Sequence, residues 1–193
     1  MFCFTVYYLG KYPEVKQRLR EELDTVLGND SNKPLTISDL DKLQYCDAII
    51  KEVSRHRPVA VMIGRINYES DNVGGYTWKE GTQFQMFYPA IMMHKDHWTE
   101  PEKFDPDRFY KVDESDKYLL EKKKLKNALP MFGGGIRMCP GRKFAITELK
   151  CLLASVYRKY DIEMADKDAP LYYRSDIINA CEKLIIKVKP RKS

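Results

Sequence analysis

The most informative segment of the sequence is Phe132-Gly133-Gly134-Gly135-Ile136-Arg137-Met138-Cys139-Pro140-Gly141. Apolar residues recur at helical spacing over residues 144–160, which predicts a long helix directly after this loop. Cys139 then lies just ahead of a helix N-terminus, where unpaired backbone N–H groups and the helix dipole favour a thiolate. Soft metal centres prefer a thiolate ligand, so the segment indicates a metal site at Cys139.

The residues next to Cys139 suit a flat ligand that carries carboxylates. The glycines of the segment allow the backbone to approach a planar group closely and to adopt positive φ. Arg137, two residues before the sulfur, can pair with a carboxylate in bidentate geometry. Phe132 can shield the sulfur from water and tune its surroundings.

Each part of this pattern also has an ordinary structural interpretation. A single cysteine near a helix start is usually a small buried side chain, and a run of glycines is usually a loop. A phosphate-binding loop is a third interpretation, but no lysine lies at the Walker spacing and no dinucleotide fingerprint follows a strand. The combination of five residue types at five fixed positions arises by chance on the order of once in ten thousand chains of this length.

The spacing FxxGxRxCxG over residues 132–141 resembles the haem-binding loop of the cytochrome P450 family, the haem-thiolate monooxygenases. Upstream, Glu52-Val-Ser-Arg55 is similar to the ExxR motif of that family. Pro106-Asp-Arg-Phe109 is similar to its PERF motif, with an aspartate in place of the usual glutamate. Arg65 lies ten residues after Arg55, where family members often hold an arginine against a haem propionate. The resemblance covers the chain from residue 13 to its end.

The resemblance implies a fold that is mainly α with a small antiparallel β portion. It implies the C-terminal part of the cytochrome P450 fold, truncated at the N-terminus, so that residues 1–193 form a single partial domain. Cys139 would then be the axial ligand of the iron of haem b. The other cofactor-binding residues that it implies are Arg137, Arg65, Phe132, Gly133, Gly135, Ile136, Gly141 and Ala145.

The resemblance also gives Glu52, Arg55 and Arg108 a structural role, as a buried charge cluster that stabilises the chain beneath the haem. Glu52 and Arg55 are three residues apart, so they share one face of a helix. On an exposed helix the same spacing is common and contributes little to stability, and this second interpretation stays open from the sequence.

By resemblance, the function is insertion of one oxygen atom of O2 into a small apolar organic substrate, with electrons from NADPH through a reductase. The acid–alcohol pair that delivers protons in the family, most of the distal pocket and the membrane anchor would precede Met1, so no catalytic residue is expected in this chain. The alternatives are a non-catalytic fragment and a haem-thiolate isomerase or dehydratase that does not activate O2. The full-length parent is expected at the cytosolic face of the endoplasmic reticulum membrane.

Several weaker signals have two interpretations each. Val61 and Met62 are expected substrate contacts by resemblance, and a plain strand core explains them equally well. His94 and His97 could share a metal, but no third ligand is evident, so solvated histidines are the better interpretation. A basic cluster could dock an acidic redox partner or form a solvated helix face, and it comprises Lys122, Lys123, Lys124 and Lys126.

Composition excludes other classes of protein. The net charge of +5 is spread along the chain, whereas nucleic-acid binding usually needs a concentrated basic stripe. The 5 cysteines lack CxxC spacing and are odd in number, so neither a paired-thiol zinc site nor a disulfide framework is expected. No apolar run reaches the roughly 20 residues of a membrane span.

Periodicity predicts the remaining elements. The opening residues 1–9 are interpreted as the end of a helix whose beginning is missing, and further helices are predicted over residues 13–28, 45–55 and 115–126. Strands are predicted over residues 59–68, 83–87, 162–164 and 184–188.

Overall fold

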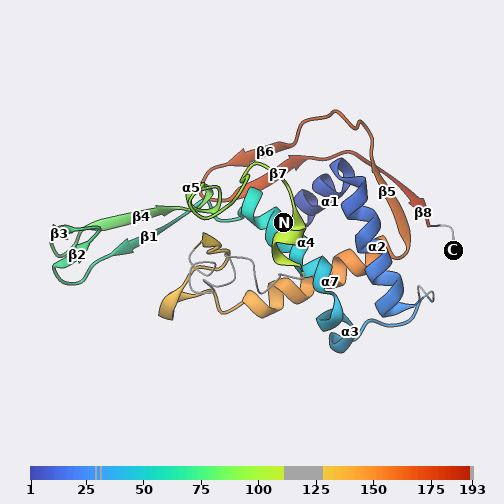
Figure 1. Cartoon of the computed structure of the whole chain (residues 1–193), viewed down its shortest axis with the longest axis horizontal. Coiled ribbons are helices and arrows are strands. Elements are labelled where there is room, and N and C mark those ends of the chain that lie inside the picture. The colour runs from blue at the N-terminus through green and yellow to red at the C-terminus, as the bar shows by residue number, and fades with distance from the viewer. Residues whose placement is uncertain (29, 31, 111–127, 192–193) are drawn as a thin grey trace.

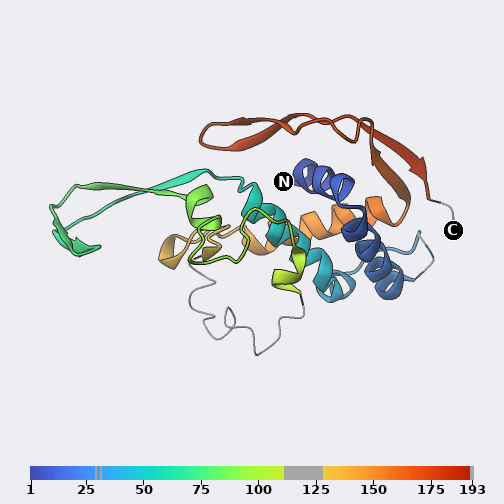
Figure 2. The ribbon, with the colours of Figure 1, turned by 45° about the horizontal axis from the view of Figure 1, so that its top comes forward.

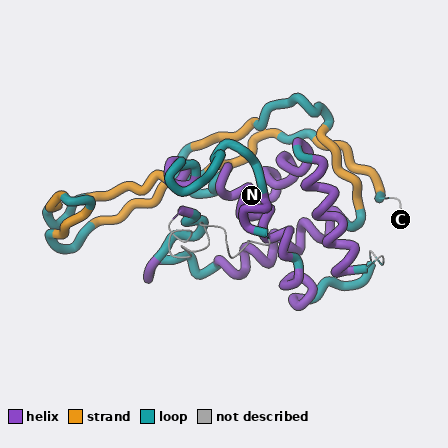
Figure 3. Tube along the Cα trace, viewed as in Figure 1, coloured by secondary structure: helices purple, strands orange, loops and turns teal. Residues whose placement is uncertain are grey.

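The computed structural model describes residues 1–28, 30, 32–110 and 128–191, and within them helices combine with small antiparallel sheets. Figures 1 and 3 show a helical body with strands along one side and a long hairpin that extends away from it. The helices are α1 (Phe2–Lys11), α2 (Pro13–Leu27), α3 (Ile37–Lys42), α4 (Gln44–His56), α5 (Tyr88–Met92) and α7 (Arg142–Tyr157), with the 3-10 turns η1 (Pro106–Phe109) and η2 (Gly135–Arg137). The strands are β1 (Met62–Ile66), β2 (Asp71–Val73), β3 (Tyr76–Trp78), β4 (Gln83–Phe87), β5 (Tyr160–Met164), β6 (Tyr172–Ser175), β7 (Asn179–Lys183) and β8 (Ile186–Pro190).

Helix α2 forms where its apolar spacing predicts it. Pro13 occupies the first turn, where its missing N–H costs nothing, and Leu19 and Leu23 are fully buried one turn apart. Gly28 follows the last helical residue with a φ of 74°, a value that residues with a side chain rarely adopt. The predicted helix over residues 13–28 is therefore confirmed.

Helix α4 is the centre of the body and contacts α1, α2, α5, α7 and η1 (Figure 2). Its residues Ile49, Ile50 and Val53 are fully buried, and they meet fully buried side chains of α1 and α7, such as Leu9 and Leu153. Burying side chains of this size stabilises the fold by about 1.5–3 kcal/mol each. The position of α4 therefore fixes the polar residues near its C-terminal end.

The first turn of α4 is capped from another helix. Leu43, the residue before it, has no side-chain acceptor, so the first N–H groups need an outside partner. The Glu22 carboxylate of α2 accepts hydrogen bonds from the N–H groups of Tyr45 at 2.6 Å and Cys46 at 2.9 Å. This carboxylate also lies at the positive end of the α4 dipole.

We expect Glu22→Ala to lower the free energy of unfolding by about 1–2 kcal/mol, because two N–H groups lose a charged acceptor. Urea denaturation followed by circular dichroism measures the change. Glu21→Ala is the matched control, since Glu21 is exposed and, among the described residues, its carboxylate bonds only Gln17 on the same helix, at 3.1 Å. A loss no larger than that of the control would contradict the cap.

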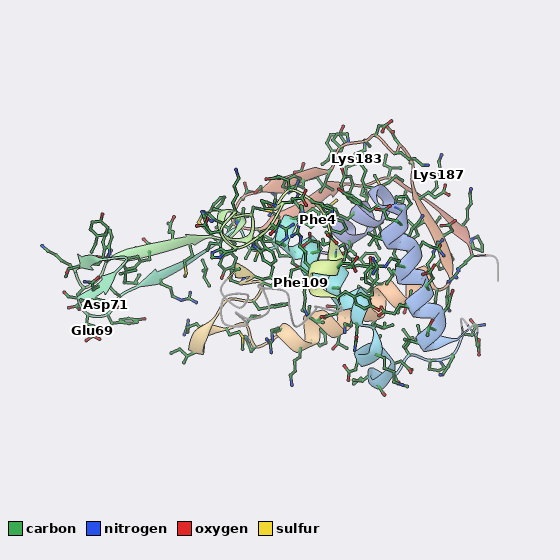
Figure 4. All side chains as sticks on the ribbon, in the orientation of Figure 1. Phe4, Glu69, Asp71, Phe109, Lys183 and Lys187 are labelled. Atoms are coloured by element: carbon green, nitrogen blue, oxygen red, sulfur yellow. The ribbon has the colours of Figure 1, made fainter. Side chains whose placement is uncertain are left out.

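Strands β1 and β4 pair in register, with Arg65 opposite Phe84, and form the long hairpin. Figure 4 labels Glu69 and Asp71 at its far end, where β2 and β3 continue it as a second small sheet. The predicted strand over residues 83–87 is confirmed in full, and the one over residues 59–68 is shorter than expected. Residues near the base of the hairpin therefore lie beside the helical body, whereas those at its tip do not.

The C-terminal strands form two further antiparallel pairs, β5 with β8 and β6 with β7. β5 and β8 confirm the predicted strands in this region, although β8 begins at Ile186 and ends at Pro190. The helix predicted over residues 144–160 is confirmed with shifted ends, because α7 begins at Arg142 and ends at Tyr157, and Tyr160 already begins β5. The β6–β7 hairpin was not predicted.

Within the described residues, no helix is long and apolar enough to cross a lipid bilayer. The helix expected over residues 115–126 and the basic cluster of Lys122, Lys123, Lys124 and Lys126 lie outside the described residues.

Candidate haem-binding site

The loop before α7 is closed by backbone hydrogen bonds. The Cys139 N–H donates to the carbonyl of Phe132 at 2.9 Å, and the Met138 N–H donates to the carbonyl of Gly135 at 3.2 Å. Gly133 and Gly135 have φ of 75° and 65°, in the left-handed region that side chains rarely adopt. The two glycines therefore allow the backbone to turn back, so that Cys139 lies next to Phe132 at the start of the loop.

Cys139 lies at the end of this loop with an exposed side chain. Helix α7 begins three residues later, and its N-cap Gly141 supplies no side-chain acceptor for the first N–H groups. A carbon added at Gly141 would lie 3.8 Å from the Cys139 sulfur, so the sulfur lies close to the helix start. This placement combines an accessible sulfur with a positively polarised helix end, as a thiolate ligand requires.

Apolar side chains next to Cys139 in the chain are also exposed to solvent. Ile136 is completely exposed, Phe144 has 74% of its surface exposed and Met138 has 40%. Phe132 and Ala145 are half-buried. Exposed apolar side chains of this size that gather on one loop and the following helix turn are typical of a surface that meets a partner or a ligand.

Two arginines of this region have no carboxylate partner among the described residues. Arg137 is exposed and forms no hydrogen bond or ion pair with them, and Arg65 donates only to the carbonyl of Gly64, at 2.9 Å. Arg65 also lies close enough to Tyr88 to affect it: burial raises the pKa of the Tyr88 hydroxyl, and the Arg65 charge partly opposes this rise.

The loop packs against the strand that carries Arg65. A carbon added at Gly133 would lie 3.9 Å from both the Ile63 side chain and the Arg137 carbonyl oxygen. Ile63 and Arg65 are two residues apart on β1, so their side chains share one face of that strand. The structure thus brings the Arg65 face of β1 to the loop of Arg137 and Cys139.

The donor set fits a flat, apolar metal complex with carboxylates. A sulfur ligand is accessible, exposed apolar side chains accompany it, and two guanidinium groups nearby lack acidic partners within the described part of the chain. Guanidinium groups pair strongly with carboxylates, and a thiolate binds soft metal ions, so the residues present match both parts of such a ligand.

A separate, buried charge cluster lies at the C-terminal end of α4. Arg55 donates through Nε to Glu52 Oε2 at 2.8 Å and through Nη2 to Glu52 Oε1 at 2.8 Å, and both side chains are completely buried. Arg108 lies 3.5 Å from Glu52 through Nε, with 14% of its side chain exposed. The structure therefore brings together the three charged residues that the motifs single out, and the interpretation as a surface pair is wrong.

Residues that the sequence did not single out complete this cluster. Arg55 donates to the carbonyl oxygens of Met92 at 3.2 Å and Lys103 at 3.1 Å, and its guanidinium lies 5.1 Å from the Trp98 ring centre. The Asp105 N–H donates to Glu52 Oε1 at 2.9 Å, which ties the start of η1 to α4. Backbone groups form several of these contacts, and no residue type in the sequence marks them.

The electrostatics of Glu52 follow from this geometry. Burial alone raises the pKa of the Glu52 carboxyl, but hydrogen bonds from Arg55 and His56, the Arg55 charge and the Asp105 N–H outweigh it. The net effect holds the pKa of Glu52 below its ordinary value, so the group stays ionised at neutral pH. His56 Nε2 lies 3.4 Å from Glu52 Oε1, a contact that the spacing of four residues on α4 could have indicated.

The comparison with known families covers the part of the chain that contains both clusters. The sequence model of the family Cytochrome P450 matches residues 2–188. The chain belongs to the cytochrome P450 family.

Curated P450 relatives resemble the chain over most of its length. Cytochrome P450 4V2 of Mus musculus is 34% identical over 175 residues, which are 91% of this chain and 32% of the relative. Cytochrome P450 4c3 of Drosophila melanogaster is 32% identical over 189 residues, 97% of this chain and 34% of the relative. The chain therefore spans about a third of the length of the curated P450s that it matches.

Asp107, which replaces the usual glutamate of the P450 PERF motif, forms an ion pair with another helix. Asp107 accepts two hydrogen bonds from Arg18 of α2, both at 2.7 Å, and the Arg18 guanidinium lies 4.2 Å from the Tyr45 ring centre. The pair is about half exposed, so its contribution to stability is at most about 1 kcal/mol. This aspartate links η1 to α2, whereas Arg108 links the same turn to α4.

The remaining candidates of the P450 chain lie at the start of β1 and in the segment after α5. Val61 is buried, and its N–H donates to Ile177 at 3.0 Å, whereas the next residue, Met62, is exposed. The rings of His94 and His97 lie 5.7 Å apart. Within the described ranges, no group of three or more histidine, cysteine or carboxylate residues could hold a metal ion.

Proposed function

We propose that Cys139 is the axial thiolate ligand of the iron of haem b, and that Arg137 and Arg65 bind its propionates. The observation that carries this proposal is the exposed Cys139 sulfur at the start of α7, on a loop closed by its own N–H. Family membership supports haem as the cofactor, and the unpaired guanidinium groups beside the loop support the propionate contacts.

We propose further that the parent protein is a monooxygenase that inserts one oxygen atom of O2 into a small apolar substrate. Its electrons would come from NADPH through a reductase, and its place would be the cytosolic face of the endoplasmic reticulum membrane. The relatives named above are cytochrome P450s, and the chain matches about a third of their length. This similarity supports the reaction class. Val61 and Met62 remain our candidates for substrate contacts.

The chain's own residues would contribute binding, orientation and exclusion of water. Bound haem supplies the iron at which O2 is activated, and a thiolate ligand increases the electron density there. The N–H groups at the start of α7 would face the sulfur of Cys139 in its iron-bound form. Ile136 and Phe144 would cover apolar edges of the ligand and keep water from the sulfur. The Glu52 cluster holds α4 and η1 together and would touch no reacting atom.

The decisive experiment is a haem titration of the purified chain, followed by reduction under carbon monoxide. We expect saturable binding and the strongly red-shifted Soret band that marks a thiolate ligand. A band at the position typical of histidine ligation, or no saturable binding, would contradict the proposal for this chain.

We expect Arg137→Gln to weaken haem binding about 10-fold, because one charge-assisted hydrogen bond to a propionate is lost. The position of the carbon monoxide band should not change, since the sulfur ligand is intact. Arg174→Gln is the matched control: Arg174 is an exposed arginine of β6 that pairs with Asp176 at 3.0 Å. Equal haem affinities of the two variants would show that Arg137 does not bind a propionate.

A further inference from the structure

Two cysteines that are far apart in the sequence lie side by side in the fold. Cys3 is in α1 and Cys181 is in β7, directly opposite Tyr173 of β6. Phe4, labelled in Figure 4, contacts the Tyr173 ring edge-on, with ring centres 6.1 Å apart. Figures 1 and 2 both show the β6–β7 hairpin passing over α1. The residue after Cys3 therefore touches the cross-strand partner of Cys181.

The two thiols lie close enough for the Cys3 side chain to act on the Cys181 thiol, and both act on the same neighbouring group, the amino group of Met1. Cys3 is exposed, so a dissolved oxidant reaches its sulfur, whereas Cys181 is half-buried against the core. Burial, and then the neighbouring Cys3, raise the pKa of the Cys181 thiol.

The other cysteines lack such a partner. Cys46 is completely buried, and burial raises the pKa of its thiol strongly, so it is shielded from oxidants. Cys139 belongs to the site described above, and Cys151 lies half-buried on α7. Within the described residues, adjacent thiols that an oxidant can reach are thus found at Cys3 and Cys181.

We propose that Cys3 and Cys181 form a reversible disulfide that ties α1 to the β6–β7 hairpin when the protein meets a hydroperoxide. The exposed Cys3 sulfur attacks the peroxide, the O–O bond breaks, and water leaves with Cys3 as a sulfenic acid. The Cys181 thiolate then attacks the Cys3 sulfur; an S–S bond forms, the S–O bond breaks, and the released hydroxide takes up the proton that Cys181 lost. In total two thiols lose two electrons and two protons, and one hydrogen peroxide becomes two waters. A small thiol such as glutathione reverses the reaction by exchange.

This crosslink would act on the segment that leads into β1. The Asn179 N–H donates to the Val59 carbonyl at 2.8 Å, and its side-chain amide donates to the Pro58 carbonyl at 2.7 Å. Asn179 lies two residues before Cys181 on the same strand. Oxidation would therefore fix the hairpin on which residues 58–61 rest, and would close almost the whole chain into one loop.

Treatment of the full chain with equimolar hydrogen peroxide, followed by alkylation and peptide mass mapping, tests the proposal. We expect a linked peptide pair that contains Cys3 and Cys181 and is lighter by two hydrogens, with dithiothreitol restoring both thiols. The melting temperature of the oxidised chain should rise by about 5–15 °C, because the crosslink restricts the unfolded chain. Cys3→Ser and Cys181→Ser should each abolish both effects, whereas Cys151→Ser, the control, should leave both unchanged.

The opposing outcomes are equally clear. If both residues remain fully alkylatable after oxidation, or if Cys3 is found linked to another cysteine or to a second chain, the proposal is wrong. A linked peptide without any rise in melting temperature would overturn the stabilising tie between α1 and the hairpin.

Discussion

Replacement of Cys139 by serine is expected to abolish the red-shifted carbon monoxide band and to weaken haem binding at least about 100-fold. A serine hydroxyl does not ionise at neutral pH, so the iron loses its anionic ligand. Loss of groups that merely orient a ligand already costs 10–100-fold in metal affinity, and loss of the ligand itself should exceed that. Haem titration and the reduced carbon monoxide spectrum measure both quantities.

The same substitution should leave the fold intact, which separates loss of a ligand from loss of structure. Cys139 is exposed, and exposed substitutions usually change the free energy of unfolding by less than about 0.5 kcal/mol. Cys151→Ser, on helix α7 and outside the loop, is the control and should keep the band. Persistence of the red-shifted band in Cys139→Ser would assign the iron to another sulfur.

The Cys139 loop could be predicted because its information is local. Ten consecutive residues contain the glycines, the arginine and the cysteine, and the structure needs no distant segment to place the sulfur ahead of α7. The same is true of α2, where the apolar spacing from Val15 to Leu27 specifies one buried face. Where local pattern and fold agree in this way, sequence reasoning is sufficient.

Contacts between distant segments could not be predicted in the same way. Tyr172–Ser175 and Asn179–Lys183 are short and rich in polar residues, and they become strands only by pairing with each other and resting on the body. Arg18 and Asp107 meet across 89 positions of sequence. The predicted helix over residues 144–160 extended past Tyr157 because β5 is specified by its pairing with β8.

The Glu52 cluster could be predicted only in part from the sequence. Its contacts lead to a second prediction with a large expected effect. The motifs identify its three charges, but they do not identify the groups that complete it: backbone atoms of residues 92, 103 and 105, the Trp98 ring and the His56 side chain. The backbone groups satisfy hydrogen bonds but carry no net charge. The stability of the buried Arg55 guanidinium therefore depends on the negative charge of Glu52.

We expect Glu52→Gln to lower the free energy of unfolding by about 3–5 kcal/mol at pH 7, because it leaves the completely buried Arg55 without a counter-charge. Glutamine matches glutamate in size, so the loss reports the charge rather than a cavity. Asp107→Asn is the matched control, since Asp107 also pairs with an arginine, Arg18, but 42% and 50% of the Arg18 and Asp107 side chains are exposed. The control should lose no more than about 1 kcal/mol. Urea denaturation of both variants gives the comparison.

The pH dependence distinguishes this electrostatic origin from a packing defect. The folded protein holds the pKa of Glu52 below the ordinary value of 4.5, so the unfolded chain takes up the proton first as the pH falls. The stabilisation from Glu52 is therefore complete above pH 4.5 and is lost as the pH falls through the folded-state pKa. The difference between the original chain and Glu52→Gln should be equal at pH 6 and pH 7 and should shrink below pH 4.5. A difference that stays constant down to acid unfolding would indicate that glutamine disturbs packing, and the charge of Glu52 would then not stabilise the cluster.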